Sequence, residues 1–174
     1  MLTVGDTFPD YCLTAAMPDG GFASVSRSDD ARRWKVLFFW PADFTFVCPT
    51  EVSAFGRAAA AFASRGAVVL GCSTDTHWVH KAWRESNPML SDLGIPMLSD
   101  PKRELTGALG VLGPDGLARR ATFIVDPQGV VRFASVVDDK VGRSVSETLR
   151  VLDALQTDEL TPCEWRRGEP TLEG

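Results

Sequence analysis

Two short apolar runs separated by a helical segment constrain the fold of this chain most strongly. The runs are KVLFFW at 35–40 and AVVLGCS at 67–73, and each is typical of a strand buried on both faces. Between them, TEVSAFGRAAAAF at 50–62 has apolar residues at helical spacing and an alanine run of high helix propensity. A strand, a helix and a second strand in this order predict a long crossover and parallel pairing.

The second half of the chain predicts antiparallel strands and more helices. A helix is expected over 75–86, and a turn-rich segment with one short helix near 102–108 follows it. ATFIVD and VVRFASVV flank DPQG, where Pro and Gly mark the turn of a β-hairpin. Ser144 can cap a last helix with apolar residues at helical spacing. The fold class is therefore α/β: a thioredoxin-like sandwich, with a mixed central sheet and helices on both faces.

Length and charge restrict the domain organisation and the partners. The 174 residues suggest a single domain over 1–174, with a polar tail at about 157–174 and a loosely assigned extension at 1–34. The net charge of −5 argues against a nucleic-acid-binding protein, which normally carries a basic face. It also gives no sign of the basic amphipathic helix that a membrane-surface protein would need.

The N-terminus and the cysteines indicate a reducing compartment. No apolar run reaches the length of a membrane span, and MLTVGDTFPDY lacks the pattern of a signal peptide, so we expect a cytoplasmic protein. Thiols are kept reduced there, and a disulfide is more often catalytic than structural. None of the four cysteines forms a C-x-x-C pair, which disfavours a zinc ribbon and a dithiol redox motif.

Cys48 has unusual surroundings. It lies in PADFTFVCPTE (41–51), between an apolar strand and the first turn of a helix, and Pro49 suits that turn. The free N–H groups and partial positive charge of a helix N-terminus favour a thiolate over a thiol. Thr45 places a hydroxyl nearby, and apolar neighbours would shield the sulfur from water. The alternative is a cysteine that is simply packed in the core.

PADFTFVCPTE resembles the signature P-x-x-x-T-x-x-C of the peroxiredoxins. Four further segments are similar to the bacterial alkyl hydroperoxide reductases of the AhpC type, which belong to the typical 2-Cys group: STDTHWVHKAW, RATFIVDPQG, VGRSVSETLRVLDALQ and CEWRRGEPTL. The resemblance extends over nearly the whole chain. It implies an enzyme, a thiol peroxidase that reduces hydrogen peroxide and small organic hydroperoxides without a metal, haem or flavin cofactor.

The resemblance also implies roles for particular residues. Cys48 would be the peroxidatic cysteine, Thr45 would hydrogen-bond the peroxide and the sulfur, and Pro41 would shield the pocket. Arg120 would hold the thiolate charge; Arg119 is adjacent, but neighbouring side chains of a strand point to opposite faces. Glu51 and Arg143 match positions that support this arginine.

Resolution of the oxidised sulfur is expected at Cys163. A sulfenic acid condenses with a second thiol, and the resemblance implies that this thiol comes from the tail of the partner subunit in a homodimer, with dimers assembling into a ring such as a decamer. Cys163 departs from the family pattern, which usually places its cysteine at the position of Thr161. Cys12 and Cys72 are interpreted as small apolar filler.

Several alternatives remain open. If Cys163 cannot reach Cys48, the protein would be a one-cysteine peroxidase resolved by an external thiol; a non-catalytic holdase or binding module would keep only the fold. The reductant could be thioredoxin, an AhpD-like adaptor or a flavoprotein reductase. His77 and His80 lie three residues apart on a predicted helix, and we expect them at the surface or at an interface rather than on a metal.

Overall fold

The computed structural model describes residues 1–173. These residues divide into two compact units, Met1–Arg143 and a second unit that begins at Ser144. The first unit contains a seven-stranded sheet in the order β2-β1-β5-β4-β3-β6-β7. The strands are β1 (Cys12–Ala16), β2 (Phe22–Ser26), β3 (Trp34–Phe39), β4 (Ala67–Ser73), β5 (Met97–Ser99), β6 (Arg120–Val125) and β7 (Val131–Val137).

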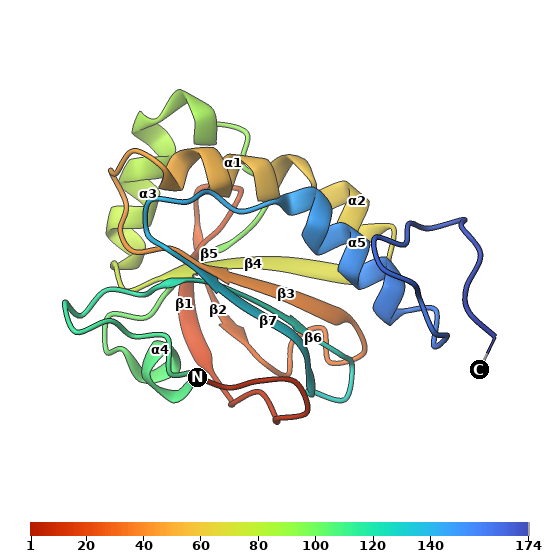
Figure 1. Ribbon diagram of the computed structural model, residues 1–174. Helices are drawn as coiled ribbons and strands as arrows, with labels where there is room; N and C mark the ends of the chain where they lie inside the picture. The colour runs from red at the N-terminus through yellow and green to blue at the C-terminus, as the bar shows by residue number, and fades with distance from the viewer. Residues whose placement is uncertain (174) are drawn as a thin grey trace. The chain divides into compact units, whose positions relative to one another are not determined.

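The helices of the first unit lie between successive strands in the sequence, as expected for crossover connections. They are α1 (Cys48–Arg57), α2 (Ala59–Ala63), α3 (His77–Ser86), the short 3-10 helix η1 (Pro88–Leu90) and α4 (Glu104–Ala108). β3, β4 and β5 are parallel, whereas β6 pairs antiparallel with both β3 and β7. Figure 1 shows α1, α2 and α3 on one side of the sheet and α4 on the other. The predicted mixed sheet with helices on its faces is confirmed.

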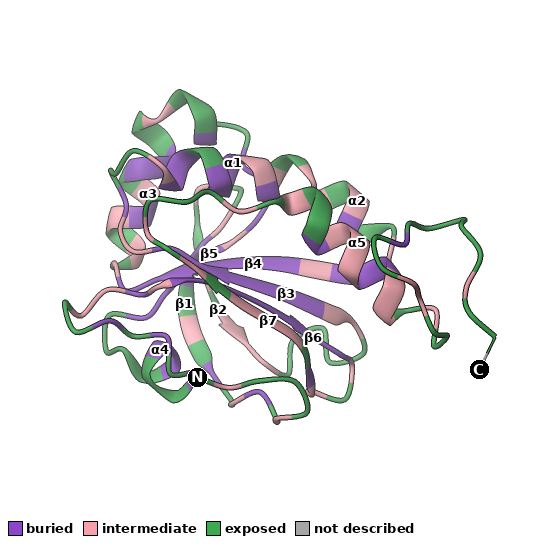
Figure 2. Cartoon of the chain, viewed as in Figure 1, coloured by how far each residue is buried: buried purple, intermediate pink, exposed green. Residues whose placement is uncertain are grey.

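Alternating side chains of β3 fill two cores. Leu37 and Phe39 belong to a cluster that also contains Leu105 of α4. On the opposite face, the ring of Phe38 stacks on Phe55 of α1, with centroids 4.1 Å apart. Successive residues of a strand point to opposite faces of the sheet. A strand that is apolar along its whole length is therefore covered on both faces, as β3 is here. Figure 2 shows β3 almost entirely buried.

The structure differs from the sequence-based expectation in three places. Residues 1–34, an extension that the sequence assigned only loosely, contain the antiparallel hairpin β1–β2 at one edge of the sheet. The turn-rich middle segment also contains a strand, β5, which pairs with β1 and β4. The helix expected over 50–62 is divided at Ala58 into α1 and α2.

The second unit contains α5 (Val145–Leu155) and the polar tail. The Ser144 hydroxyl accepts a hydrogen bond from the amide of Glu147, which is the predicted N-cap. In the tail, the side chain of Trp165 is buried, and its indole N–H donates to the carbonyl of Glu169. Cys163 is exposed.

Candidate active site

Cys48 is the first residue of α1, and its side chain is fully buried. The loop 40–47 carries the chain there from the end of β3. The Val47 carbonyl accepts hydrogen bonds from the amide and hydroxyl of Thr50, which closes the first turn. The sulfur therefore lies at the end of the helix where amide groups lack intrahelical partners and the helix dipole is positive.

A guanidinium group lies beside this sulfur. Arg120 is the first residue of β6, which is the antiparallel neighbour of β3. Its Nη1 donates to Sγ of Cys48 at 3.3 Å and to Oε2 of Glu51 at 2.5 Å. Its Nε donates to the carbonyl of Asp139 at 2.8 Å. Three partners thus fix a buried cation in contact with the sulfur.

Glu51 joins two arginines at this site. Its Oε1 accepts from the backbone amide of Arg143 at 3.0 Å and from Nε of Arg143 at 2.8 Å, while Oε2 accepts from Nη2 at 3.1 Å. Burial alone would raise the pKa of Glu51, but the hydrogen bonds and charge of Arg143, together with the charge of Arg120, bring that pKa below its ordinary value. The carboxylate is therefore ionised and holds both guanidinium groups.

The position of Arg143 is further fixed by packing. Its Nη1 donates to the carbonyl of Ala121 at 2.7 Å, and its guanidinium lies over the rings of Phe38 and Phe55, at 5.4 Å and 5.8 Å from the centroids. Cation–π contacts of this kind favour a charged group over an aromatic face. Arg143 thus ties Glu51 to the β3–α1 core.

Arg120 keeps its proton although it is buried. Burial lowers the pKa of a guanidinium, but the hydrogen bond and charge interaction with Cys48 and the neighbouring Glu51 raise the pKa of Arg120 above its ordinary value. The adjacent Arg119 has a different environment: its Nη1 pairs with Asp139 at 2.8 Å and with Asp115 at 3.4 Å. Only one of the two arginines faces the sulfur, as strand alternation requires.

The structure thus brings Cys48, Glu51, Arg120 and Arg143 together. Comparison with known proteins shows the family: the model of the AhpC/TSA family matches residues 4–134. Alkyl hydroperoxide reductase C of Mycolicibacterium smegmatis is 52% identical, with 99% of this chain and 94% of that protein covered.

The chain belongs to the AhpC/TSA family. Among solved structures, Mycobacterium tuberculosis AhpC has a TM-score of 0.88 and 47% identity, covering 95% of this chain and 99% of that one. The reduced 2-Cys peroxiredoxin of Plasmodium vivax has a TM-score of 0.94 and 31% identity, covering 98% of this chain and 93% of that one. The prediction that the chain is a peroxiredoxin, and hence a thiol peroxidase, is confirmed.

In this peroxiredoxin the other residues of the signature segment lie outside the cluster. The Thr45 hydroxyl is exposed and donates to the carbonyl of Ala42 at 2.9 Å. Pro41 is half-buried. Phe44 and Phe46 are two of the apolar neighbours that were expected to shield the sulfur from water, but they are 60% and 96% exposed. Cys163 lies in the second unit.

A buried polar network anchors the loop before the peroxiredoxin's Cys48, and the sequence analysis missed it. Nδ1 of His80 lies 2.6 Å from Oδ2 of Asp43, and the indole N–H of Trp40 donates to Oδ1 at 2.8 Å. His80 was expected at the surface or at an interface, yet it is fully buried within the chain. Asp43 and the Leu98 carbonyl, 3.0 Å from Nε2, provide partners for both ring nitrogens. The only sequence signal was an aspartate inside the signature segment.

The two remaining cysteines of the peroxiredoxin differ from each other. Cys72 is buried as predicted; burial, and then the charge of Asp100, raises the pKa of its thiol. Cys12 was expected as apolar filler but is exposed on β1, where Sγ lies 3.1 Å from the hydroxyl oxygen of Ser24. The interpretation of Cys12 was wrong because β1 lies near the edge of the sheet, where one face is open.

Within residues 1–173, no group of three or more His, Cys, Asp or Glu side chains could hold a metal ion. No helix in the same part of the chain is long and apolar enough to cross a membrane.

Proposed function

We propose that Cys48 is the peroxidatic residue of this thiol peroxidase and that hydroperoxides are its substrates. The observation that carries the proposal is the contact between Nη1 of Arg120 and the Cys48 sulfur at the N-terminus of α1. A fixed cation and a helix dipole both favour the ionised sulfur, which is the nucleophilic form.

The reaction follows from these charges. The Cys48 thiolate attacks the terminal oxygen of the hydroperoxide, an S–O bond forms and the O–O bond breaks. The departing alkoxide or hydroxide takes up a proton and leaves as alcohol or water, and the sulfur is oxidised to a sulfenic acid. Negative charge moves onto the peroxide oxygens during this step, where the preorganised guanidinium of Arg120 can stabilise it.

Glu51 and Arg143 act through Arg120. Glu51 holds Nη1 of Arg120, and Arg143 holds Glu51 through three hydrogen bonds. We assign Thr45 to binding the peroxide: its hydroxyl proton is directed to the carbonyl of Ala42, so its oxygen lone pairs remain able to accept from the substrate. We assign Pro41 to excluding water.

We further propose that Cys163 of a partner subunit resolves the sulfenic acid as a disulfide, which an external protein thiol then reduces. Two features support association of subunits. β7 is a terminal strand of the sheet, with one edge unpaired among residues 1–173. Phe22, His77 and Trp78 form an aromatic cluster in which Trp78 is 63% exposed, which suits a contact between dimers in a ring. A reducing compartment such as the cytoplasm fits this chemistry.

A one-cysteine mechanism is the second candidate, because Cys163 is displaced by two positions from the usual place of the family's resolving cysteine. The two mechanisms are separated by treating the reduced protein with a small excess of hydrogen peroxide. The proposed mechanism predicts rapid loss of two thiols per chain and a disulfide-linked dimer on a non-reducing gel. In Cys163→Ser, a single fast turnover without a dimer is expected. Unchanged dimer formation in Cys163→Ser contradicts the role of Cys163.

A further inference from the structure

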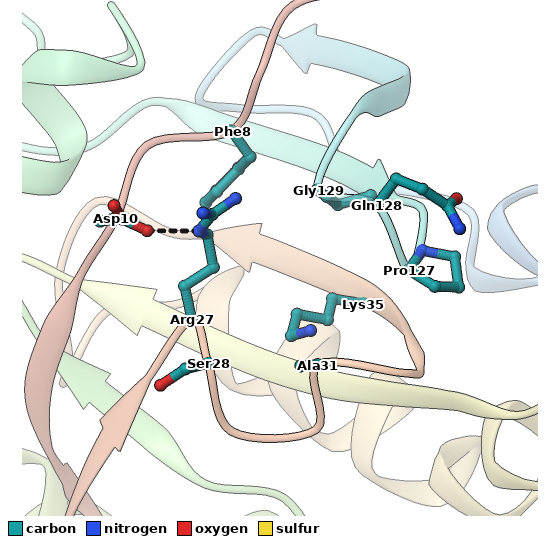
Figure 3. A pocket seen from close by; sticks show the side chains of 10 residues that line it. Phe8, Asp10, Arg27, Ser28, Ala31, Lys35, Pro127, Gln128 and Gly129 are labelled. Carbon is teal, nitrogen blue, oxygen red and sulfur yellow. Dashed lines mark hydrogen bonds and ion pairs between the residues drawn. The ribbon is translucent and has the colours of Figure 1, made fainter.

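A pocket lined by two cationic side chains lies at the opposite end of β3 from Cys48. It is a cavity of about 230 Å³ between the loop that follows β2, the start of β3 and the β6–β7 turn. Figure 3 shows Arg27, Lys35, Pro127 and Gln128 around this space. Since β3 is six residues long and rises ~3.3 Å per residue, the length of the strand separates the pocket from the loop 40–47 that leads to Cys48.

Lys35 is the unusual group in this pocket. It is only 5% exposed, and among residues 1–173 no carboxylate forms an ion pair with it. Its ammonium group donates to the carbonyl of Asp30 at 2.9 Å. Burial lowers the pKa of Lys35, and the charge of Asp30 offsets this only in part. A buried cation with a neutral partner is electrostatically unfavourable unless an anion accompanies it.

Arg27 adds a second cation to the same lining. Its Nε pairs with Oδ1 of Asp10 at 2.5 Å, and its two Nη atoms make no hydrogen bond within the described part of the chain. Gly129 has a φ of +85°, a conformation that favours glycine, and the absence of a Cβ there leaves room for Nη1 of Arg27. Asp10 lines the pocket too, but its carboxylate is taken by the Nε edge of the guanidinium.

Much of the remaining lining is apolar and held by backbone hydrogen bonds, although Ser28 and Gln128 also line the pocket. Phe8 and Val125 are buried, and Pro127 closes the turn. The amide of Phe8 donates to the carbonyl of Gly129 at 2.8 Å. The amide of Gly129 in turn donates to the carbonyl of Asp126 at 2.9 Å. A preformed cavity with apolar walls and a few convergent charged groups is typical of a small-molecule site.

We propose that this pocket binds a small organic carboxylate, with the carboxylate between Lys35 and Arg27 and an apolar body of about the size of a benzene ring against Phe8, Val125 and Pro127. The volume equals roughly eight waters at ~30 Å³ each, which is sufficient for such a molecule. The net charge of −5 disfavours non-specific binding of anions, so saturable binding would reflect this site. The inference does not depend on the proposed roles of Cys48 and Cys163.

The test is calorimetric titration of the full-length protein with sodium benzoate, and with acetate and inorganic phosphate at equal ionic strength. Benzoate should bind at a single saturable site at least about tenfold more tightly than acetate or phosphate. Lys35→Met and Arg27→Leu should each weaken benzoate binding by roughly tenfold or more. Arg32→Leu is the matched control, because Arg32 is an exposed cation in the same loop but does not line the pocket, and it should bind as the wild type does.

Absence of saturable benzoate binding to the wild type overturns the proposal. Unchanged binding in both Lys35→Met and Arg27→Leu also overturns it. If Lys35→Met does not fold, unchanged benzoate binding in Arg27→Leu is sufficient to overturn the proposal. Phosphate binding as tight as that of benzoate overturns the assignment of an apolar body.

Discussion

Cys48 and Cys72 are equally buried but lie in opposite electrostatic environments. Both side chains are fully inaccessible. Cys48 contacts the guanidinium of Arg120 at the N-terminus of a helix, whereas Cys72 lies in the apolar core with the charge of Asp100 nearby. Burial and then this carboxylate raise the pKa of Cys72, so its thiol stays protonated. A neighbouring cation, rather than the degree of burial, is what separates the environment of Cys48 from that of Cys72, and such a cation favours a reactive thiolate.

The most direct test replaces each sulfur in turn. Cys48→Ser should abolish peroxide consumption, because an alcohol is not ionised at neutral pH. Cys72→Ala should retain the activity and lower the free energy of unfolding by about 1 kcal/mol through a small cavity. Stopped-flow peroxide assays and urea denaturation measure the two effects. Residual turnover in Cys48→Ser would show that another thiol carries the reaction.

The next largest effect is expected at the cation itself. Arg120→Met keeps the volume but removes the charge beside the sulfur, and the rate of peroxide reduction should fall ~10²–10³-fold, as for other preorganised donors. Arg119→Met is the matched control, since that side chain pairs with Asp115 and Asp139 instead, and should stay within about twofold of the wild type. Equal losses in the two variants would mean that Arg120 has no special role.

Glu51→Gln tests the support of that cation. The amide cannot pair with two guanidinium groups, and breaking a buried ion pair costs about 3–5 kcal/mol of stability. The pKa of Glu51 is lowered in the folded state, so its contribution to stability is present above the ordinary glutamate pKa of about 4.3 and is lost as the pH falls below it. Glu51→Gln should therefore flatten the acid side of the stability profile, measured by chemical denaturation across pH. If stability falls at acidic pH in Glu51→Gln just as in the wild type, ionised Glu51 does not stabilise the folded state as proposed.

The smallest effect is expected beside Cys72. The hydroxyl of Tyr11 is buried without a hydrogen-bond partner in residues 1–173, and burial raises its pKa. Tyr11→Phe removes this unpaired group and should leave stability unchanged or raise it by up to about 1 kcal/mol, with no change in activity. A thermal melt measures the change in stability, and a peroxide assay measures the activity. A large loss of stability would reveal a polar partner for the hydroxyl.

The parts of the fold that could be predicted from the sequence are those with dense apolar patterns. β3, β4 and the β6–β7 hairpin combine buried faces with clear turn residues. β5 has only three residues, too few to display a period. β1 and β2 are rich in small and polar residues because they lie at the sheet edge, so their hairpin was not predicted.

The candidate site was predictable at Cys48 because the helix start, the proline and the threonine are close together in sequence. The approach of Arg120 and Arg143 was not visible locally, since Arg143 lies 92 residues from Glu51. The register of β6 on β3 places Arg120 near the end of β3 that leads to Cys48. The Asp43–His80 pair could not be foreseen, because two histidines at helical spacing indicate a polar face, whereas the partners that allow His80 to be buried come from a loop and from Leu98.

The ion cluster around Glu51 has a consequence for the catalytic cycle. In the proposed mechanism the cluster holds two guanidinium groups, one carboxylate and the Cys48 thiolate, whose charges sum to zero. Conversion of the sulfur to an uncharged sulfenic acid leaves one positive charge in excess, in a place where excess charge is costly. The proposed mechanism therefore places an unbalanced positive charge in the sulfenic acid form, and an incoming thiolate would bring the missing negative charge to it.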